Sequence, residues 1–187
     1  IAWYENADGV GGSWTYHEIS TAADFARSVF AIDVDGDGDV DALSASGIDN
    51  TIAWYENADG VGGSWTTHVI STSADGARSV FAIDVDGDGD VDALSASGYD
   101  DTLAWYENAD GVGGSWTYHE ISTTADGADT VFATDVDGDG DVDALLTLHA
   151  VLTIAWYENA DGAGGSWTYH EISTGVDDAA RHVFAID

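Results

Sequence analysis

Three Asp-rich segments hold the residues whose type and spacing most clearly suggest chemistry. The first reads Asp-Val-Asp-Gly-Asp-Gly-Asp-Val-Asp from Asp33 to Asp41, and the same nine residues begin again at Asp84 and Asp135. Carboxylates at alternate positions of a tight loop can turn inward together, and glycine at position 6 permits the sharp reversal that this requires. Ca²⁺ accepts about six to eight oxygen ligands in flexible geometry, whereas Mg²⁺ prefers rigid, partly hydrated sites and Zn²⁺ prefers His or Cys. The loops therefore predict calcium sites.

All five aspartates of each loop are predicted ligands, with about one Ca²⁺ per complete loop, and position 7 is expected to contribute its backbone carbonyl. The predicted ligands are Asp33, Asp35, Asp37, Asp39, Asp41, Asp84, Asp86, Asp88, Asp90, Asp92, Asp135, Asp137, Asp139, Asp141 and Asp143. An EF-hand needs an acid at position 12, where this chain has Ser44, Ser95 and Leu146. The alternative is a solvated acidic turn, but so many adjacent carboxylates would repel one another without a cation. Calcium is expected to be structural.

A repeat of 51 residues must position these loops. Units begin at residues 1, 52, 103 and 154 within one repeat domain spanning 1–187, and the last unit is truncated after an insertion near Gly175–Asp178, so that Asp187 opens a fourth loop. Each unit contains short β-branched or alternating segments, such as 28–32, 40–46, 51–56 and 65–71, separated by Gly-rich or Asp-rich turns. The pattern predicts an all-β fold of propeller blades with four antiparallel strands, as a fragment or partial ring of about four blades. A stacked solenoid is the competing architecture.

Composition restricts the partners. The formal net charge is −33, with three Arg, no Lys and no Cys. Such a chain is repelled by nucleic acid, so no nucleic-acid partner is expected. No long apolar run is present, so no membrane insertion is expected. Cations are expected to neutralise part of the acidic charge.

The repeating residues resemble a known family. Phe-Ala-Ile-Asp-Val-Asp-Gly-Asp-Gly-Asp-Val-Asp-Ala-Leu, then Ile-Ala-Trp-Tyr-Glu-Asn and Trp-Thr-x-His-x-Ile, are similar to the FG-GAP/VCBS repeat of integrin α-subunit and lectin-like propellers. The resemblance implies calcium at the loop pattern Asp33, Asp35, Asp37, Gly38 and Asp41 and at the two equivalent loops. It also implies rings of about seven blades in extracellular or cell-surface proteins that bind protein or glycan ligands.

Other repeated residues are weaker candidates for function. Trp3, Trp14 and their equivalents could present aromatic platforms to sugars, although packing between blades is favoured. His17 and its equivalents are expected to form structural hydrogen bonds. Neither an acid–base pair nor an activated nucleophile is evident, so the chain is not expected to be an enzyme.

The third copy departs from the repeat. A polar hairpin tip becomes apolar over Leu146–Leu152, which suggests self-association through Leu146, Leu148, Val151 and Leu152, or else local burial. Asp129 also replaces the Arg found at this position in the other copies. The preferred function is a calcium-binding adhesion or assembly module. A lectin-like propeller and an accessory propeller of a polysaccharide-degrading enzyme are the alternatives.

Overall fold

The computed structural model describes residues 1–175 and 181–185. Within them the chain forms fourteen β-strands and no helix. Asp187 and most of the expected insertion near Gly175–Asp178 lie outside the described residues. In the described part of the chain, no helix is long and apolar enough to cross a membrane.

The strands form one two-stranded hairpin and three four-stranded antiparallel sheets, in chain order within each sheet. The N-terminal hairpin contains β1 (Ala2–Asn6) and β2 (Trp14–Glu18). Sheet 1 contains β3 (Ala26–Ile32), β4 (Asp41–Ser46), β5 (Thr51–Asn57) and β6 (Trp65–Ser71). Sheet 2 contains β7 (Ala77–Ile83), β8 (Asp92–Ser97), β9 (Thr102–Asn108) and β10 (Trp116–Ser122). Sheet 3 contains β11 (Ala128–Thr134), β12 (Asp143–Leu148), β13 (Thr153–Asn159) and β14 (Trp167–Thr174).

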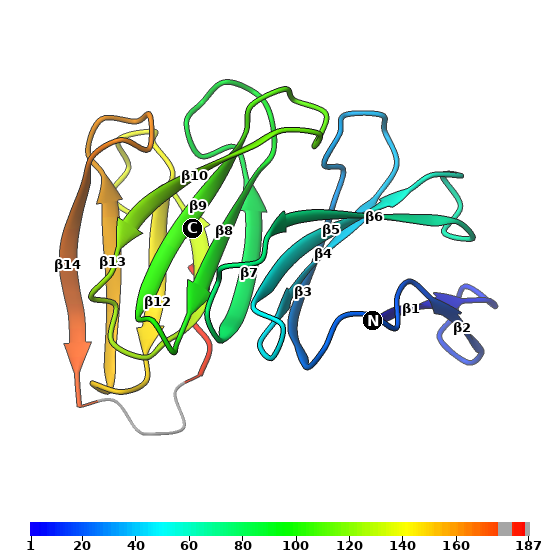
Figure 1. Cartoon of the computed structure of the whole chain (residues 1–187), viewed down its shortest axis with the longest axis horizontal. Coiled ribbons are helices and arrows are strands. Elements are labelled where there is room, and N and C mark those ends of the chain that lie inside the picture. Colours follow the sequence, from blue (N-terminus) through cyan, green and yellow to red (C-terminus); the bar gives the residue numbers. More distant parts are fainter. Residues whose placement is uncertain (176–180, 186–187) are drawn as a thin grey trace.

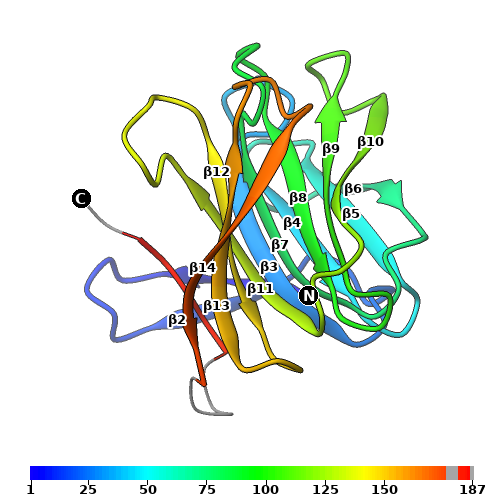
Figure 2. The ribbon, with the colours of Figure 1, turned by 90° about the vertical axis from the view of Figure 1, so that its left-hand side faces the viewer.

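The sheets stand side by side, from the N-terminal hairpin at one end of the molecule to sheet 3 at the other (Figure 1). Neighbouring sheets meet along their first strands, β3 beside β7 and β7 beside β11, and the turned view places these three strands next to one another (Figure 2). The all-β class and the repeated four-stranded antiparallel sheets are thus confirmed. The sheets do not close into a ring, so the propeller remains a prediction.

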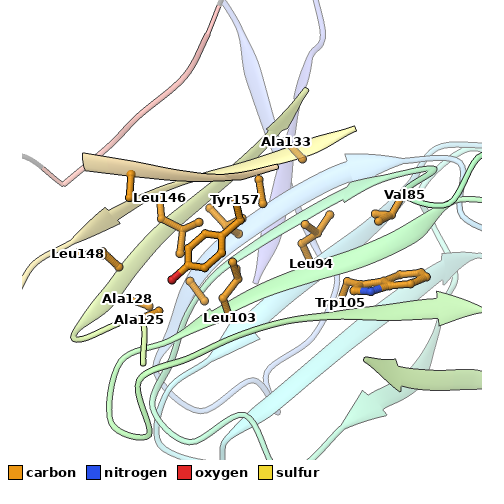
Figure 3. Close-up of a cluster of buried hydrophobic side chains, with 14 residues drawn as sticks. Val85, Leu94, Leu103, Trp105, Ala125, Ala128, Ala133, Leu146, Leu148 and Tyr157 are labelled. Atoms are coloured by element: carbon orange, nitrogen blue, oxygen red, sulfur yellow. The ribbon is translucent and has the colours of Figure 1, made fainter. Parts of the chain in front are cut away.

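Hydrophobic cores lie between consecutive sheets, because the inner strands of each sheet bury apolar side chains against the next sheet. Between sheets 2 and 3, Leu94, Leu103 and Trp105 pack with Leu146 and residues around it (Figure 3). An equivalent core lies between sheets 1 and 2. Consecutive sheets are therefore joined mainly by apolar packing, as repeat proteins require.

The prediction of an exposed apolar tip in the third copy is wrong for two of its residues. Leu146 and Leu148 are 0% and 4% exposed and belong to the core between sheets 2 and 3. The cause is that β12 continues to Leu148, so both side chains lie on a strand rather than in the turn. Val151 is 46% exposed and Leu152 is half-buried, which leaves only these two for the predicted self-association.

The inner strand of sheet 1 is less covered than its equivalents. Val29 on β3 is 61% exposed, whereas Val80 on β7 and Val131 on β11 are 3% and 5% exposed. An apolar cavity of about 510 Å³ lies beside it, lined by residues of the N-terminal hairpin and sheet 1. The face that a neighbouring inner strand covers in sheets 2 and 3 is therefore open in sheet 1.

Candidate metal centre

Each Asp-rich loop connects the first two strands of its sheet. The loop from Asp33 to Asp41 joins β3 to β4, and the loops that begin at Asp84 and Asp135 occupy the same place in sheets 2 and 3. Gly36 and Gly38 have φ angles of 75° and 96°. An L side chain disfavours such angles, so both glycines, and not only the one at position 6, permit the tight course of the loop.

Carboxylate groups hold the loop in shape through bonds to its own backbone. Asp33 accepts hydrogen bonds from the amides of Gly36 at 2.8 Å and Gly38 at 2.9 Å. Asp41 accepts one from the Val34 amide at 3.0 Å and another from the Asn57 amide, at the end of β5, at 2.8 Å. The same bonds recur in the loops of sheets 2 and 3. The backbone of the loop and of the end of β5 therefore holds these side-chain oxygens in place.

In each loop the structure brings three carboxylates together. One oxygen from each member lies within 4.8 Å of the others. The clusters are Asp33, Asp35 and Asp37; Asp84, Asp86 and Asp92; and Asp135, Asp137 and Asp143. Positions 1 and 3 are common to all, while the third member comes from position 5 in sheet 1 and from position 9 in sheets 2 and 3.

The remaining predicted ligands differ in their placement. Asp41 is buried and accepts two backbone amides. At position 5, Asp88 and Asp139 each accept the backbone amide of the aspartate two residues later, Asp90 and Asp141, at 2.9 Å. At position 7 the Asp39 side chain lies against Gly60 in the β5–β6 turn, where there is no room for a Cβ atom. Asp90 and Asp141 lie in the same way on the equivalent glycines. Position 7 therefore lies outside the carboxylate clusters, and its use of a backbone carbonyl stays a prediction.

Burial makes the negative charge of these groups costly. Asp92 is 1% exposed, and burial raises its pKa to about 7 despite two backbone hydrogen bonds that oppose the shift. Burial likewise raises the pKa of Asp41 and of Asp143, and nearby aspartates raise each further. The pKa of Asp35 is raised by burial, with smaller contributions from the charges of Asp37, Asp33 and Glu56. A bound cation would remove this penalty.

The donor set fits Ca²⁺. All members of the three clusters are aspartates, and neither His nor Cys is among them. The Arg side chains that could supply positive charge are engaged elsewhere: Arg27 lies over the Phe25 ring, and Arg78 and Arg181 pair with Asp129. Hard oxygen ligands in a flexible loop suit Ca²⁺, and positions 1, 3 and 9 could hold it with loop carbonyls completing the shell.

Sequence reasoning missed the asparagine that ends the third strand of each sheet. Asn108 donates its backbone amide to Asp92 at 2.9 Å, and its side-chain Nδ2 donates to the Val34 carbonyl in the loop of sheet 1 at 3.2 Å. Asn159 makes the same pair of bonds to Asp143 and to the Val85 carbonyl of sheet 2. The signal was available, because Asn stands at this position in all four copies. This residue ties each loop to the loop of the neighbouring sheet.

The first Trp of three units joins neighbouring sheets, while the His of each unit stacks on this Trp within its own sheet. Trp105 is 1% exposed, and its Nε1 donates to the Gly164 carbonyl of sheet 3 at 3.1 Å. Its ring stacks on His119 with centroids 4.3 Å apart, and His119 is 2.8 Å from Glu107. Trp3 and Trp54 make the equivalent bonds to the following sheet. Trp54 and Trp105 are therefore buried in the sheet contacts and are not free to stack on sugars, whereas Trp3 and Trp156 are half-buried.

The second Trp of each unit is more accessible. Trp14 is 58% exposed, while Trp65, Trp116 and Trp167 are half-buried. Each donates its Nε1 to the carbonyl of the glycine three residues earlier. All four rings of this second set thus keep some surface available.

Comparison with known proteins agrees with the repeat geometry. A family model described as an FG-GAP-like repeat matches residues 33–95 and 84–146. Each match runs from one Asp-rich loop into the β-strand that follows the next loop, so the two together span more than half of the chain. A search of curated protein sequences gave no match. The chain belongs to the family of FG-GAP-like repeat proteins.

Proposed function

We propose that this chain is a calcium-stabilised β-propeller module of a secreted or cell-surface protein, used for adhesion or extracellular assembly and not for catalysis. The module would hold one Ca²⁺ per complete Asp loop. Extracellular calcium modules bind Ca²⁺ with dissociation constants of about 10⁻⁴–10⁻³ M, and such weak binding is expected of sites on largely exposed loops. Three ions would bring the formal charge from −33 to about −27.

One observation carries the metal part of the proposal. Three loops of identical sequence each bring three carboxylates so close that one oxygen of each lies within 4.8 Å of the others. Charged groups so close together, some of them buried, are stable only if they are neutralised by protons or by a cation. The same arrangement in three sheets supports a shared structural ion.

The position of the loops supports a structural role for that ion. Asn108 joins the loop of sheet 2 to that of sheet 1, so an ion that orders one loop also fixes the contact with the next sheet. The ring itself is supported by the side-by-side sheets that meet along their first strands. The exposed Val29 supports a larger ring, because a neighbouring inner strand covers its equivalents.

Calcium-dependent unfolding tests the proposal. At a free calcium concentration about 100 times the dissociation constant, each site adds about 2.7 kcal/mol. For a chain of this size, three sites raise the melting temperature by roughly 15–30 °C over the calcium-free protein. Titration calorimetry should give three sites, and Mg²⁺ should replace Ca²⁺ poorly. Asp59→Asn, in an exposed turn outside the loops, is the matched control and should leave both results unchanged.

Equal melting temperatures in chelator and in millimolar calcium would refute the metal role. The adhesive role is tested separately, by binding of the calcium-loaded chain to immobilised matrix proteins and glycans. Binding that survives chelation at temperatures where the chain is unfolded would contradict a folded adhesive module.

A further inference from the structure

One glutamate of each four-stranded sheet lies outside the Asp loop but next to it. In sheet 2 this residue is Glu107, near the end of β9, which pairs with β8, the strand that begins at Asp92. Ala93 is opposite Tyr106, so continuing the register by one residue brings Asp92 opposite Glu107. Opposite residues of antiparallel strands have their side chains on the same face of the sheet, with Cβ atoms about 5 Å apart. Glu107 and the buried Asp92 are therefore neighbours across the strands.

The other two sheets repeat this arrangement. Their registers bring Glu56 opposite Asp41 in sheet 1 and Glu158 opposite Asp143 in sheet 3. Like charges directly opposite each other on a sheet are destabilising. All three sheets thus place a fourth carboxylate beside the Asp loop, where its charge is unfavourable unless a cation is bound.

The charge of the glutamate also acts on an aspartate of the metal cluster. Burial raises the pKa of Asp86, at position 3 of the loop of sheet 2, and the charges of neighbouring aspartates and of Glu107 raise it further. The pKa of Asp35 in sheet 1 is raised in the same way, with Glu56 in the place of Glu107. The glutamate therefore lies within electrostatic reach of the cluster as well as of position 9.

The N-terminal hairpin has the glutamate but no Asp loop. The Glu5 side chain is 50% exposed, whereas those of Glu56, Glu107 and Glu158 are 31%, 30% and 28% exposed. The sheet that follows does not explain this difference, because sheet 1 follows the hairpin, whereas no strand follows sheet 3 among the described residues. The three covered glutamates share the Asp loop and the two strands that it joins, which the hairpin lacks. This part of the sheet therefore covers them.

A histidine on the fourth strand holds each glutamate in place. His119 Nε2 is 2.8 Å from Glu107 Oε2, and the His119 ring stacks on Trp105 with centroids 4.3 Å apart. His68 and His170 make the same two contacts in sheets 1 and 3. The bond occupies Oε2 and leaves Oε1 for another partner. The carboxylate is thus positioned by a residue that is itself fixed by packing.

We infer that Glu56, Glu107 and Glu158 each belong to the calcium site of their sheet, as a fourth carboxylate positioned by its histidine. A divalent cation would remove the repulsion between this carboxylate and the opposite aspartate. The number of charged ligands is one of the features by which calcium sites set their affinity, so the glutamate would strengthen a cluster of three aspartates. The inference rests on the proposed calcium role, which it deepens by adding a strand residue to the nine-residue loop.

Calorimetric titration of the full chain with Ca²⁺ tests this inference. The triple variant Glu56→Gln, Glu107→Gln and Glu158→Gln keeps the size of each side chain and its bond to histidine but removes the charge. It should still bind three ions, each about tenfold more weakly, which is the size of effect that one charge exerts on a nearby divalent ion in water. Glu5→Gln is the matched control, because it makes the same change beside His17, where the sheet has no Asp loop. This variant should leave the titration unchanged.

Urea unfolding in the presence of chelator separates this role from a structural one. Without calcium, the triple variant lacks three pairs of like charges, so its urea midpoint should be higher than that of the parent. A glutamate that served only to stabilise the fold through its bond to histidine would give the opposite result. The expected variant is therefore more stable without calcium and binds calcium more weakly.

Nuclear magnetic resonance of the histidine rings gives a readout of each sheet. Ring signals of His68, His119 and His170 should move as Ca²⁺ is added to the parent protein, while those of His17 should not. Parent affinity in the triple variant, an equal loss of affinity in Glu5→Gln, or a lower urea midpoint in chelator would overturn the inference and leave calcium-dependent melting intact. Absence of calcium binding by the parent would overturn both the inference and the proposed function.

Discussion

Restoring the repeat consensus at Asp129 should destabilise the protein. The other copies have Arg at this position, and all three Arg residues of the chain occupy it. Asp129 Oδ1 is 3.1 Å from Arg78 Nη1 of sheet 2, and Asp129 Oδ2 is 3.7 Å from Nη1 of Arg181 in the following unit. The carboxylate thus lies between guanidinium groups from the units on either side. Asp129→Arg would place three cations in a row.

The burial of these groups sets the magnitude. The Asp129 and Arg78 side chains are 9% and 16% exposed, so the pair between them is largely removed from water. Removing one partner of a buried ion pair costs about 3–5 kcal/mol, because the other charge stays buried and unpaired. Arg181 is 55% exposed, and a pair with so exposed a group contributes about 0–1 kcal/mol. We therefore expect Asp129→Arg to lower the free energy of unfolding by about 3–5 kcal/mol.

Urea unfolding at saturating calcium measures this change without interference from the metal sites. Asp129→Asn should lose somewhat less than Asp129→Arg, because it removes the carboxylate charge without adding a cation. The double variant Arg78→Asp with Asp129→Arg reverses the buried pair and should recover most of the loss, with only the exposed contact to Arg181 missing. An Asp129→Arg protein as stable as the parent, or a double variant no better than the single one, would refute the reasoning.

Three further predictions follow from the contacts between sheets and from the loops. Trp105→Phe removes a buried inter-sheet hydrogen bond and should lower the free energy of unfolding in urea by about 1–3 kcal/mol. Trp156→Phe should lower it less. Trp156 has the same stacking contact with a His, but within the described residues its indole makes no such hydrogen bond. Asp84→Asn should remove one calcium site or weaken it at least about tenfold in calorimetry, while Asp90→Asn, whose side chain lies on Gly111, should leave the titration unchanged. In calcium-free buffer, burial raises the pKa of Asp92 to about 7, so its contribution to the free energy of unfolding is complete below about pH 4 and is lost as the pH rises towards 7. Urea unfolding between about pH 4 and 7 should show this loss of stability. Added calcium should abolish the pH dependence.

Sequence periodicity predicted much of the fold because the signals are local. Strand 65–71 was predicted with its observed bounds, and the strand expected at 51–56 ends one residue later, at Asn57. Alternation along a strand and the glycines of tight turns depend on neighbouring residues only. The Asp loops were recognised for the same reason, since their ligands lie within nine residues.

Contacts between sheets could not be predicted in this way. Leu146 and Leu148 were read as a tip because their partners are residues of another repeat. Asp129 was noted only as a replacement of the repeated Arg, because its partner Arg78 lies 51 residues earlier. Asn108 bonds to Val34, 74 residues away. Each of these contacts depends on how one sheet is placed against the next, which residue spacing within a unit does not specify.

The metal loops and the sheet contacts are parts of one stabilising system. A four-stranded sheet of this size buries little on its own, and the cores here lie between sheets. Asn108 connects the cluster of sheet 2, through the Asp92 carboxylate, to the backbone of the preceding loop. An ion bound in one loop, as proposed, would therefore order the neighbouring loop as well as its own and stabilise the contact between the sheets. Because repeat proteins are held together by such nearest-neighbour contacts, we expect loss of one ion to loosen the sheets on both sides of its loop.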